Sequence, residues 1–253
     1  MLSSPTIERI RQLRLHGFQK ALEEQQTSGA YEDMSFQDRL GLLLEREMQE
    51  RENHSLCIRL GRVRFKESAC LEDVRPSAAR GLDKSTLKEL AQCNWIKQKR
   101  NIVVTGPSGA GKSYLSQALA HKACLMGYTA RYFRSPALLA DLDAARAEGR
   151  YRKTLNQLGR YDVLIVDDFS LCAMSESEEK DLFELIEERH RDTATIFTSQ
   201  NPVNLWHGLM PNPAIADAIL DRIIHGAIRL ELKGDSQRKE VEGNAKLDKN
   251  QRT

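Results

Sequence analysis

The sequence predicts an α/β fold, in which helices cover both faces of a parallel sheet, with a small all-helical unit before it. Short β-branched runs alternate with helical stretches after residue 100, and apolar residues recur at helical spacing before residue 65. Hydrophobic residues make up 40% of the 253 residues. A chain of this length and composition can bury one sizeable core plus a smaller appended unit.

The N-terminal part predicts two amphipathic helices separated by a turn at Thr27-Ser28-Gly29. Charged residues fill the positions between the apolar ones on either side. The apolar positions are Ile7, Ile10, Leu13, Phe18 and Leu22 before the turn, and Phe36, Leu40, Leu43, Leu44 and Met48 after it. We therefore expect a helical N-terminal domain over residues 1–65.

The remainder predicts the sheet domain, over residues 66–238. Strands are expected at 102–106, 130–135, 163–168, 194–200 and 227–232, and helices at about 113–126, 136–148, 176–191 and 213–225. The run VLIV within the third strand has no polar alternation, which indicates burial on both faces. Residues 239–253 are almost entirely polar and predict a C-terminal tail.

Composition indicates a cytoplasmic protein without a membrane partner. The chain has no run of about 18 apolar residues, and its first residues are charged and lack the apolar core of a signal peptide. The five cysteines are scattered without a C-x-x-C pair, which argues against a disulfide framework and a structural zinc site. A formal net charge of +2 does not by itself indicate a nucleic-acid partner.

Residues 106–113, which read GPSGAGKS, match the phosphate-binding pattern G-x-x-x-x-G-K-[ST]. Glycines let backbone N–H groups turn toward phosphates, Lys112 supplies positive charge to the β- and γ-phosphates, and Ser113 can ligate magnesium. The motif follows a β-branched strand and opens a helix, whose N-terminus also favours anions. We therefore expect ATP and Mg²⁺ to be bound by Gly106, Pro107, Ser108, Gly109, Ala110, Gly111, Lys112 and Ser113.

The strand VLIVDD ends in two carboxylates, at the sheet edge where doubly wound folds bind ligands. We assign Asp167 to the magnesium site and Asp168 to orienting or deprotonating the attacking water. The alternative is a pair of turn or helix-capping aspartates. Polar side chains also end the strand at 194–200, and we favour Gln200 for a contact with the γ-phosphate or water, among Thr198, Ser199, Gln200 and Asn201. The alternative is a polar strand end before Pro202 with no role in the site.

Arg222, on the predicted helix before the last strand, has two interpretations. It is a candidate arginine finger that reaches the γ-phosphate bound by a neighbouring subunit. The alternative is an exposed helix arginine paired with Asp221 or Asp217.

A basic block surrounds Phe65 and comprises Arg59, Arg62, Arg64 and Lys66. Basic residues beside an aromatic ring suit phosphate contact and base stacking. The competing interpretation is a solvated helix face.

Together these motifs resemble IstB, the ATP-binding helper of two-gene bacterial insertion sequences, within the DnaC/DnaA-like branch of AAA+ ATPases. The resemblance runs from about residue 9 to residue 238. It rests on LRLHGFQKAL, FQDRLGLLLEREMQER, RLGRVRFK, SACLEDV, GPSGAGKSYLSQALAHKA, YDVLIVDDFS, IFTSQNP and AILDRIIHGAIRLELKGDSQR.

The resemblance implies an AAA+ core with strand order 5-1-4-3-2 and a small helical N-terminal domain. It implies a protein that assembles with ATP on duplex DNA and delivers the target to a partner transposase. Lys112, Ser113, Asp167 and Asp168 become ATP and magnesium residues, Arg222 becomes the finger in trans, and Arg238 a candidate sensor arginine. A head-to-tail contact through Arg222 generates a ring or a helical filament. No sequence-reading motif such as a helix-turn-helix is apparent, so we expect little sequence preference.

Three departures from the wider AAA+ pattern qualify these roles. Asp168 stands where a glutamate is usual and is shorter by one C–C bond of about 1.5 Å, which predicts slow, switch-like hydrolysis. The sensor position, commonly Asn, is Gln200, and few residues follow Arg238, so the helical lid is reduced or absent.

A DnaC-like helicase loader would share every ATP-site residue and is the alternative function. A small-molecule kinase would need an arginine-rich lid and an acceptor pocket, neither of which is visible.

Overall fold

The computed structural model describes residues 4–67 and 69–234, and the chain divides after Gly61 into two compact units. Unit 1 contains the described residues up to Gly61, and unit 2 contains those from Arg62 onward. The long helix α3 (Phe36–Val63) passes through this division. Among the described residues, no helix is both long and apolar enough to cross a membrane.

Unit 1 is all-helical, as predicted. Its elements are α1 (Ser4–Gln12), α2 (His16–Thr27), the short turn η1 (Gly29–Tyr31) and the first part of α3. The first predicted helix is divided in two, because Arg14 adopts a left-handed φ of 55°. Gly17 lets α2 pack closely on α3, since a Cβ atom there would lie 2.6 Å from the carbonyl oxygen of Arg46.

Unit 2 begins with a helical segment that the sequence pattern did not predict. It contains η2 (Leu71–Asp73), η3 (Ala78–Arg80), α4 (Lys84–Ala91) and α5 (Asn94–Lys97). Helix α4 starts where the Asp83 carboxylate accepts the backbone N–H of Thr86 at 2.7 Å. This cap satisfies one of the N–H groups that a helix start leaves without a partner.

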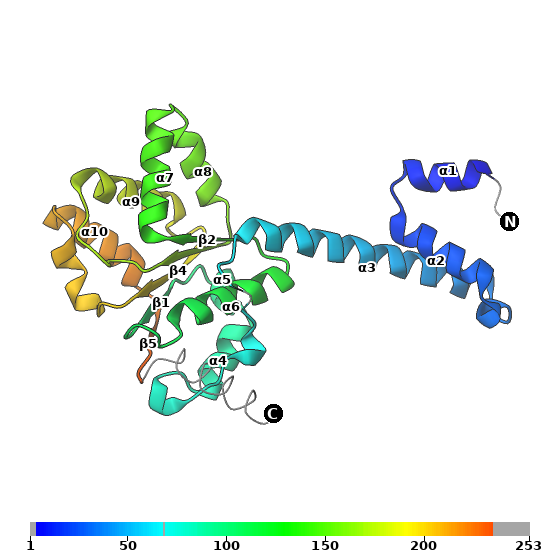
Figure 1. Cartoon of the computed structure of the whole chain (residues 1–253), viewed down its shortest axis with the longest axis horizontal. Helices are drawn as coiled ribbons and strands as arrows, with labels where there is room; N and C mark the ends of the chain where they lie inside the picture. The colour runs from blue at the N-terminus through cyan, green and yellow to red at the C-terminus, as the bar shows by residue number, and fades with distance from the viewer. Residues whose placement is uncertain (1–3, 68, 235–253) are drawn as a thin grey trace, which may run out of the picture. The chain divides into compact units, whose positions relative to one another are not determined.

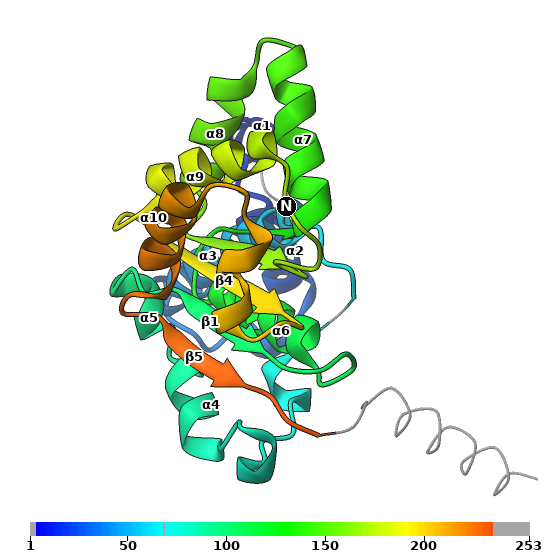
Figure 2. The same cartoon turned by 90° about the vertical axis from the view of Figure 1, so that its left-hand side faces the viewer.

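The sheet of unit 2 has five parallel strands in the order β2-β3-β4-β1-β5 (Figures 1 and 2). This is the predicted order 5-1-4-3-2 read from the opposite edge, so the predicted fold class is confirmed. The strands are β1 (Ile102–Thr105), β2 (Ala130–Arg134), β3 (Val163–Asp167), β4 (Ala194–Ser199) and β5 (Ile228–Glu231). Every residue of β3 and β4 is buried, as the unbroken apolar run in β3 predicts.

Helices cover both faces of the sheet (Figure 1). Helix α6 (Lys112–Leu125) covers one face, and the opposite face carries α7 (Ser135–Ala147), α8 (Tyr151–Gly159), α9 (Glu176–Arg189) and α10 (Pro213–Ile224). Helix α8 is absent from the sequence prediction. Between β4 and α10 the chain forms the turns η4 (Val203–Leu205) and η5 (His207–Leu209).

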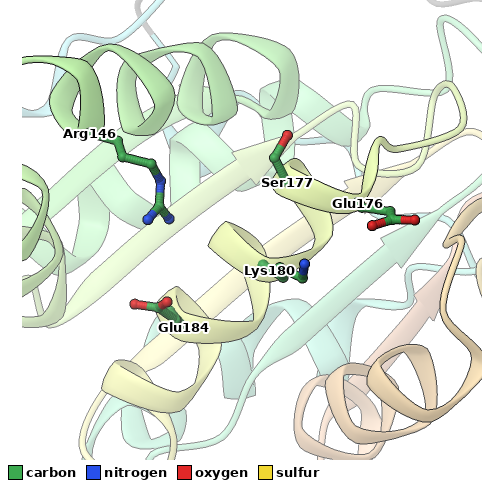
Figure 3. A pocket seen from close by; sticks show the side chains of 5 residues that line it. All are labelled: Arg146, Glu176, Ser177, Lys180 and Glu184. Carbon is green, nitrogen blue, oxygen red and sulfur yellow. The ribbon is translucent and has the colours of Figure 1, made fainter.

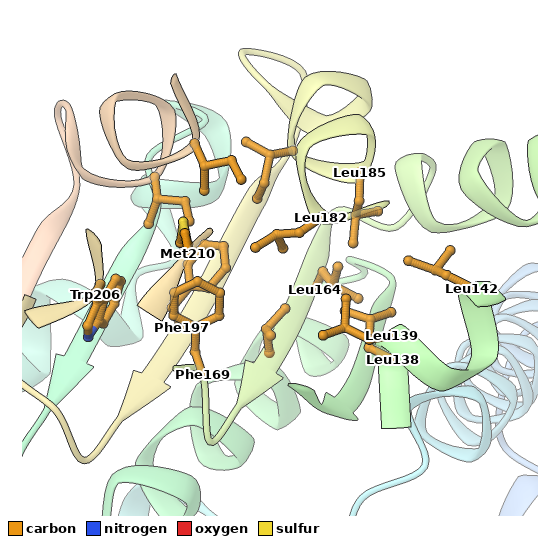
Figure 4. Packing of buried hydrophobic residues seen from close by; sticks show 14 of the residues in the cluster. Leu138, Leu139, Leu142, Leu164, Phe169, Leu182, Leu185, Phe197, Trp206 and Met210 are labelled. Atoms are coloured by element: carbon orange, nitrogen blue, oxygen red, sulfur yellow. The ribbon is translucent and has the colours of Figure 1, made fainter. Parts of the chain in front are cut away.

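The main core lies between the sheet and helices α7 to α10 (Figure 4). Phe169, the second residue after β3, packs edge-on against Phe197 of β4 and against Trp206, with ring centroids 5.2 Å and 4.8 Å apart. All three side chains are fully buried. This aromatic cluster anchors the loop that follows β3, which is the loop that carries Asp168.

Candidate functional site

The loop that joins β1 to α6 has the backbone that its glycines permit. Gly109 and Gly111 adopt left-handed φ angles of 81° and 89°, and α6 begins at Lys112. Gly106 has a φ of 147°, and a Cβ atom there would lie 2.2 Å from the carbonyl oxygen of Leu232. Gly106 is therefore required for the close approach of the chain beyond β5, in addition to the turn of the loop itself.

Lys112 lies over its own loop. Its side chain is buried, and Nζ donates a hydrogen bond to the carbonyl oxygen of Pro107 at 2.8 Å. Arg80 braces the same loop from η3, donating from Nη2 to the carbonyl oxygen of Ala110 at 3.1 Å. The sequence pattern gave no reason to single out Arg80, because its contact joins segments 30 residues apart.

Asp167 ends β3 with its carboxylate 2% exposed and held by hydroxyl groups from three elements. Ser113 Oγ donates to Asp167 Oδ1 at 2.8 Å, and Thr198 Oγ1 of β4 donates to the same oxygen. Tyr132 of β2 donates from its phenol oxygen to Oδ2 at 2.7 Å. The predicted pair of Ser113 and Asp167 is thus in direct contact, and Thr198 and Tyr132 are partners that the sequence did not reveal.

The Ser113–Asp167 pair fits a magnesium ion in its chemistry. Mg²⁺ prefers hard oxygen ligands and is usually bound by one or two protein groups together with substrate phosphates and water. A serine hydroxyl can donate its proton to Asp167 and still offer an oxygen lone pair to a cation. Within residues 4–67 and 69–234, no three His, Cys, Asp or Glu side chains group into another metal site.

Asp168 follows in a strained backbone conformation, with a left-handed φ of 56°. Its backbone N–H donates to Thr198 Oγ1 at 3.1 Å. Its carboxylate accepts from Arg134 at the end of β2, with distances to Oδ2 of 3.2 Å from Nε and 2.9 Å from Nη2. The carboxylate predicted to act on water is therefore engaged by an arginine, a partner that the sequence analysis did not identify.

The four polar residues at the end of β4 differ in their contacts and in their exposure. Thr198 contacts Asp167 as described, and Asn201 donates from Nδ2 to the carbonyl oxygen of Ser170 at 2.6 Å. Gln200, the favoured residue, is exposed. The structure thus brings Thr198 to the aspartates, whereas Gln200, two residues further along the chain, lies on the surface.

Arg222 lies on α10, and its guanidinium contacts α9 and its own helix. Its guanidinium forms an ion pair with Glu187 and lies 5.4 Å from the ring centroid of Phe183. It also donates to the carbonyl oxygen of Ala218 at 2.8 Å. The ion-pair partner is thus neither Asp221 nor Asp217, and within one chain these contacts do not bring Arg222 to the loop at 106–113.

The basic block falls on both sides of the division between the units. In unit 1, Arg59 is half-buried on α3. In unit 2, Arg62, Arg64 and Lys66 are exposed. Arg131 of the edge strand β2 lies beside them and donates to the carbonyl oxygen of Arg62 at 2.7 Å. Burial and the charge of Arg64 lower the pKa of Arg131.

A hollow of about 450 Å³ lies between α7 and α9 (Figure 3), and none of its lining residues belongs to the loop at 106–113. It is lined by Arg146, Glu176, Ser177, Lys180 and Glu184. Two acids and two bases give this lining no net preference for an anion, so the hollow does not compete with the loop as a phosphate site. Arg238, the candidate sensor, and the predicted tail at 239–253 lie outside the described residues.

The strand order, the glycine-rich loop between β1 and α6, and the contact of Ser113 with Asp167 define a P-loop nucleotide-binding protein of the AAA+ class. Solved structures agree on the fold. The DnaC helicase loader superimposes with a TM-score of 0.54 and 19% identity, covering 65% of this chain and 97% of that one. AMPPCP-bound DnaA from Aquifex aeolicus gives a TM-score of 0.59 and 18% identity, covering 74% of this chain and 57% of that one.

The chain belongs to the family of IstB-like ATP binding proteins, whose family model matches residues 8–245. A putative insertion sequence ATP-binding protein of Sinorhizobium fredii is 41% identical over 239 residues, 94% of this chain and 98% of that protein. The putative ATP-binding protein of insertion sequence IS1162 from Pseudomonas fluorescens is 43% identical over 203 residues, 80% of this chain and 88% of that protein. A putative ATP-binding protein in an insertion sequence of Mycobacterium tuberculosis is 31% identical over 230 residues, 90% of this chain and 92% of that protein.

Proposed function

We propose that this protein is an ATP-dependent DNA-binding regulator, which assembles on duplex DNA and delivers the target to a partner transposase during transposition. The similarity to proteins named for insertion sequences carries this proposal, because it extends over 94% of the chain at 41% identity. ATP binding follows from the family. ATP hydrolysis, DNA binding and delivery of the target to a transposase go beyond the family relationship and are part of our proposal.

In the proposed site, residues 106–113 hold the phosphates of ATP through backbone N–H groups and the Lys112 ammonium. Ser113 and Asp167 hold Mg²⁺, which neutralises charge on the phosphates when bound. Asp168 orients or deprotonates the attacking water. The Arg134–Asp168 pair supports slow hydrolysis, because the carboxylate must exchange an arginine for a water molecule before it can act.

Assembly in this proposal places Arg222 of one subunit against the γ-phosphate bound by the next. The side chain of Arg222 is 25% exposed, so part of it is accessible from outside the chain. To reach a phosphate it must leave Glu187, and a phosphate group offers more charge than the carboxylate it replaces. Such a contact is heterologous and generates a ring or a helical filament.

DNA binding is proposed at the exposed arginines and lysine of the basic block, with phosphates as the partner. Arg62, Arg64 and Lys66 are exposed, and Arg131 adds a fourth positive charge beside Arg62 in unit 2. Each subunit contributes a modest number of phosphate contacts, and an assembly along DNA adds them together. Arg59 is included in the proposed DNA-binding residues because the sequence pattern places it in the basic block.

Sedimentation with long duplex DNA, ATP and magnesium tests the assembly. We expect large complexes that disappear without ATP, in Lys112→Ala and in Arg222→Ala. The matched control is Arg152→Ala, because Arg152 also pairs with a glutamate of α9, at 3.6 Å from Glu188, and has no proposed role. If duplex DNA gives no assembly in any nucleotide state while single strands or a helicase do, the helicase-loader alternative replaces this proposal. The DnaC helicase loader has the same fold, so the fold by itself does not decide between the two functions.

The salt dependence of DNA binding tests the basic block separately. Each lost phosphate contact reduces the slope of log affinity against log salt by about one. We expect this reduction in Arg62→Gln and Arg64→Gln, whereas Arg160→Gln, an exposed arginine of the same unit, should retain the slope. An unchanged slope in both block variants would assign the basic block to the solvated-face interpretation.

A further inference from the structure

Tyr132 makes a contact with the candidate magnesium site that neither the sequence motifs nor the family relationship assigns. Its phenol oxygen donates to Asp167 Oδ2 at 2.7 Å, and its side chain is buried at 8% exposure. A phenol hydroxyl can donate one hydrogen bond, and in this structure that bond goes to the Asp167 carboxylate.

Strand register explains why a tyrosine can make this contact. In the parallel pair of β2 and β3, Tyr132 stands opposite Ile165, so Asp167 is its diagonal neighbour two residues further along. With strands about 4.8 Å apart and a rise of about 3.3 Å per residue, diagonal neighbours in a parallel pair are about 8 Å apart at Cα, a span that a long aromatic side chain can cross. Phenylalanine would fill the same space without the donor.

The three hydroxyl donors are shared unequally between the two oxygens of the Asp167 carboxylate. Ser113 and Thr198 both donate to Oδ1, and only Tyr132 is described as a donor to Oδ2. Without the phenol hydroxyl, Oδ2 loses its donor at a site that is 2% exposed, and the carboxylate can rotate about its Cβ–Cγ bond. Rotation would move Oδ1 away from the line of Ser113.

We propose that Tyr132 is a positioning residue for magnesium, which acts by fixing the orientation of the Asp167 carboxylate. This inference rests on the proposed magnesium site of Ser113 and Asp167. Mg²⁺ demands near-octahedral geometry, so a misoriented carboxylate weakens binding. Removing a partner that orients a metal-binding carboxylate typically lowers metal affinity by about 10- to 100-fold. The backbone N–H groups and Lys112 still hold the nucleotide phosphates, so affinity for nucleotide without metal is unchanged.

The test is Tyr132→Phe in the full chain, with binding of a fluorescent ATP analogue followed during a magnesium titration and again in EDTA. We expect the half-saturating Mg²⁺ concentration to rise about tenfold or more, while the affinity in EDTA changes less than about twofold. The matched control is Tyr151→Phe, because Tyr151 also donates to a buried aspartate, at 2.8 Å from Asp181 Oδ1, but in the α8–α9 region. This control should leave both values unchanged.

Two outcomes would overturn the inference: an unchanged magnesium requirement in Tyr132→Phe, or an equal shift in Tyr151→Phe. If Tyr132→Phe does not fold, 3-fluorotyrosine and tyrosine at position 132 provide a second comparison. Both side chains keep the hydroxyl donor, and the fluorine makes it a stronger donor. The half-saturating Mg²⁺ concentration should therefore be equal or lower with 3-fluorotyrosine, and a higher concentration would contradict the inference. Nucleotide binding by the unaltered protein that does not depend on magnesium would instead contradict the proposed site itself.

Discussion

Replacing Arg134 with alanine should accelerate ATP hydrolysis by removing the cation that engages Asp168. The pair is partly exposed, with 51% of the Arg134 side chain and 20% of the Asp168 side chain accessible. Ion pairs of this kind are worth about 0.2–1 kcal/mol. In the proposed mechanism the carboxylate must leave the pair before it acts on water. Removing the arginine therefore shifts the equilibrium toward unpaired Asp168 by at most the free energy of the ion pair. The expected gain in kcat is therefore about 1.5- to 5-fold.

The assay is steady-state hydrolysis at saturating ATP and magnesium, for the unaltered protein, Arg134→Ala and the control Arg152→Ala. High salt should raise the rate of the unaltered protein toward that of Arg134→Ala, because it screens the pair. Adding Asp168→Asn to Arg134→Ala should abolish the gain. A fall in kcat for Arg134→Ala would refute the reasoning, because it would mean that Arg134 assists the reaction and does not restrain Asp168.

Three further predictions concern stability. Arg189→Met should lower the free energy of unfolding of unit 2 by about 1–3 kcal/mol in urea denaturation, because three backbone carbonyl groups lose the donor that the buried guanidinium supplies; an unchanged free energy of unfolding would contradict this. Gly106→Ala should cost more than about 1 kcal/mol in the same measurement, since its Cβ would meet the Leu232 carbonyl oxygen at 2.2 Å, and a neutral result would show that the chain after β5 can move aside. Glu47→Ala should destabilise α2 by about 1.5–3 kcal/mol in hydrogen exchange, because Glu47 accepts the Phe18 N–H at 3.1 Å. Burial acts to raise the pKa of Glu47, but hydrogen bonds from Arg51 and from α2 lower it below 4.5, so this stability is present above pH 4.5 and is lost as pH falls through the lowered pKa. Protection of α2 that does not change across that pH range would contradict the assignment.

The fold and the phosphate loop were largely predictable, because their signals are local. The five strands lie within one residue of their predicted ends, and the loop motif specifies its own backbone through glycine. The strand order came from resemblance to a family, since no local pattern reports which strands pair. Helix α8 was missed because its nine residues carry only two buried leucines, Leu155 and Leu158.

The partners of the two aspartates were not predictable from sequence. Tyr132, Arg134 and Thr198 reach Asp167 and Asp168 from neighbouring strands, at sequence separations of 30 to 35 residues. Strand pairing and register decide such contacts, and the spacing of residues along one strand determines neither of them. The same holds for Arg222, whose partner Glu187 lies on the neighbouring helix and not among the aspartates of its own helix.

The sequence by itself determined which chemical groups this protein has for nucleotide binding: a glycine-rich loop, a lysine, a serine and two aspartates, each in a pattern that a single segment can carry. Only the tertiary structure decided how those groups are held. It placed three hydroxyl donors on Asp167, an arginine on Asp168 and the chain beyond β5 against Gly106. The physical reason is range: backbone conformation follows from neighbours in the chain, whereas the orientation of a buried carboxylate follows from groups that only folding brings within hydrogen-bonding distance.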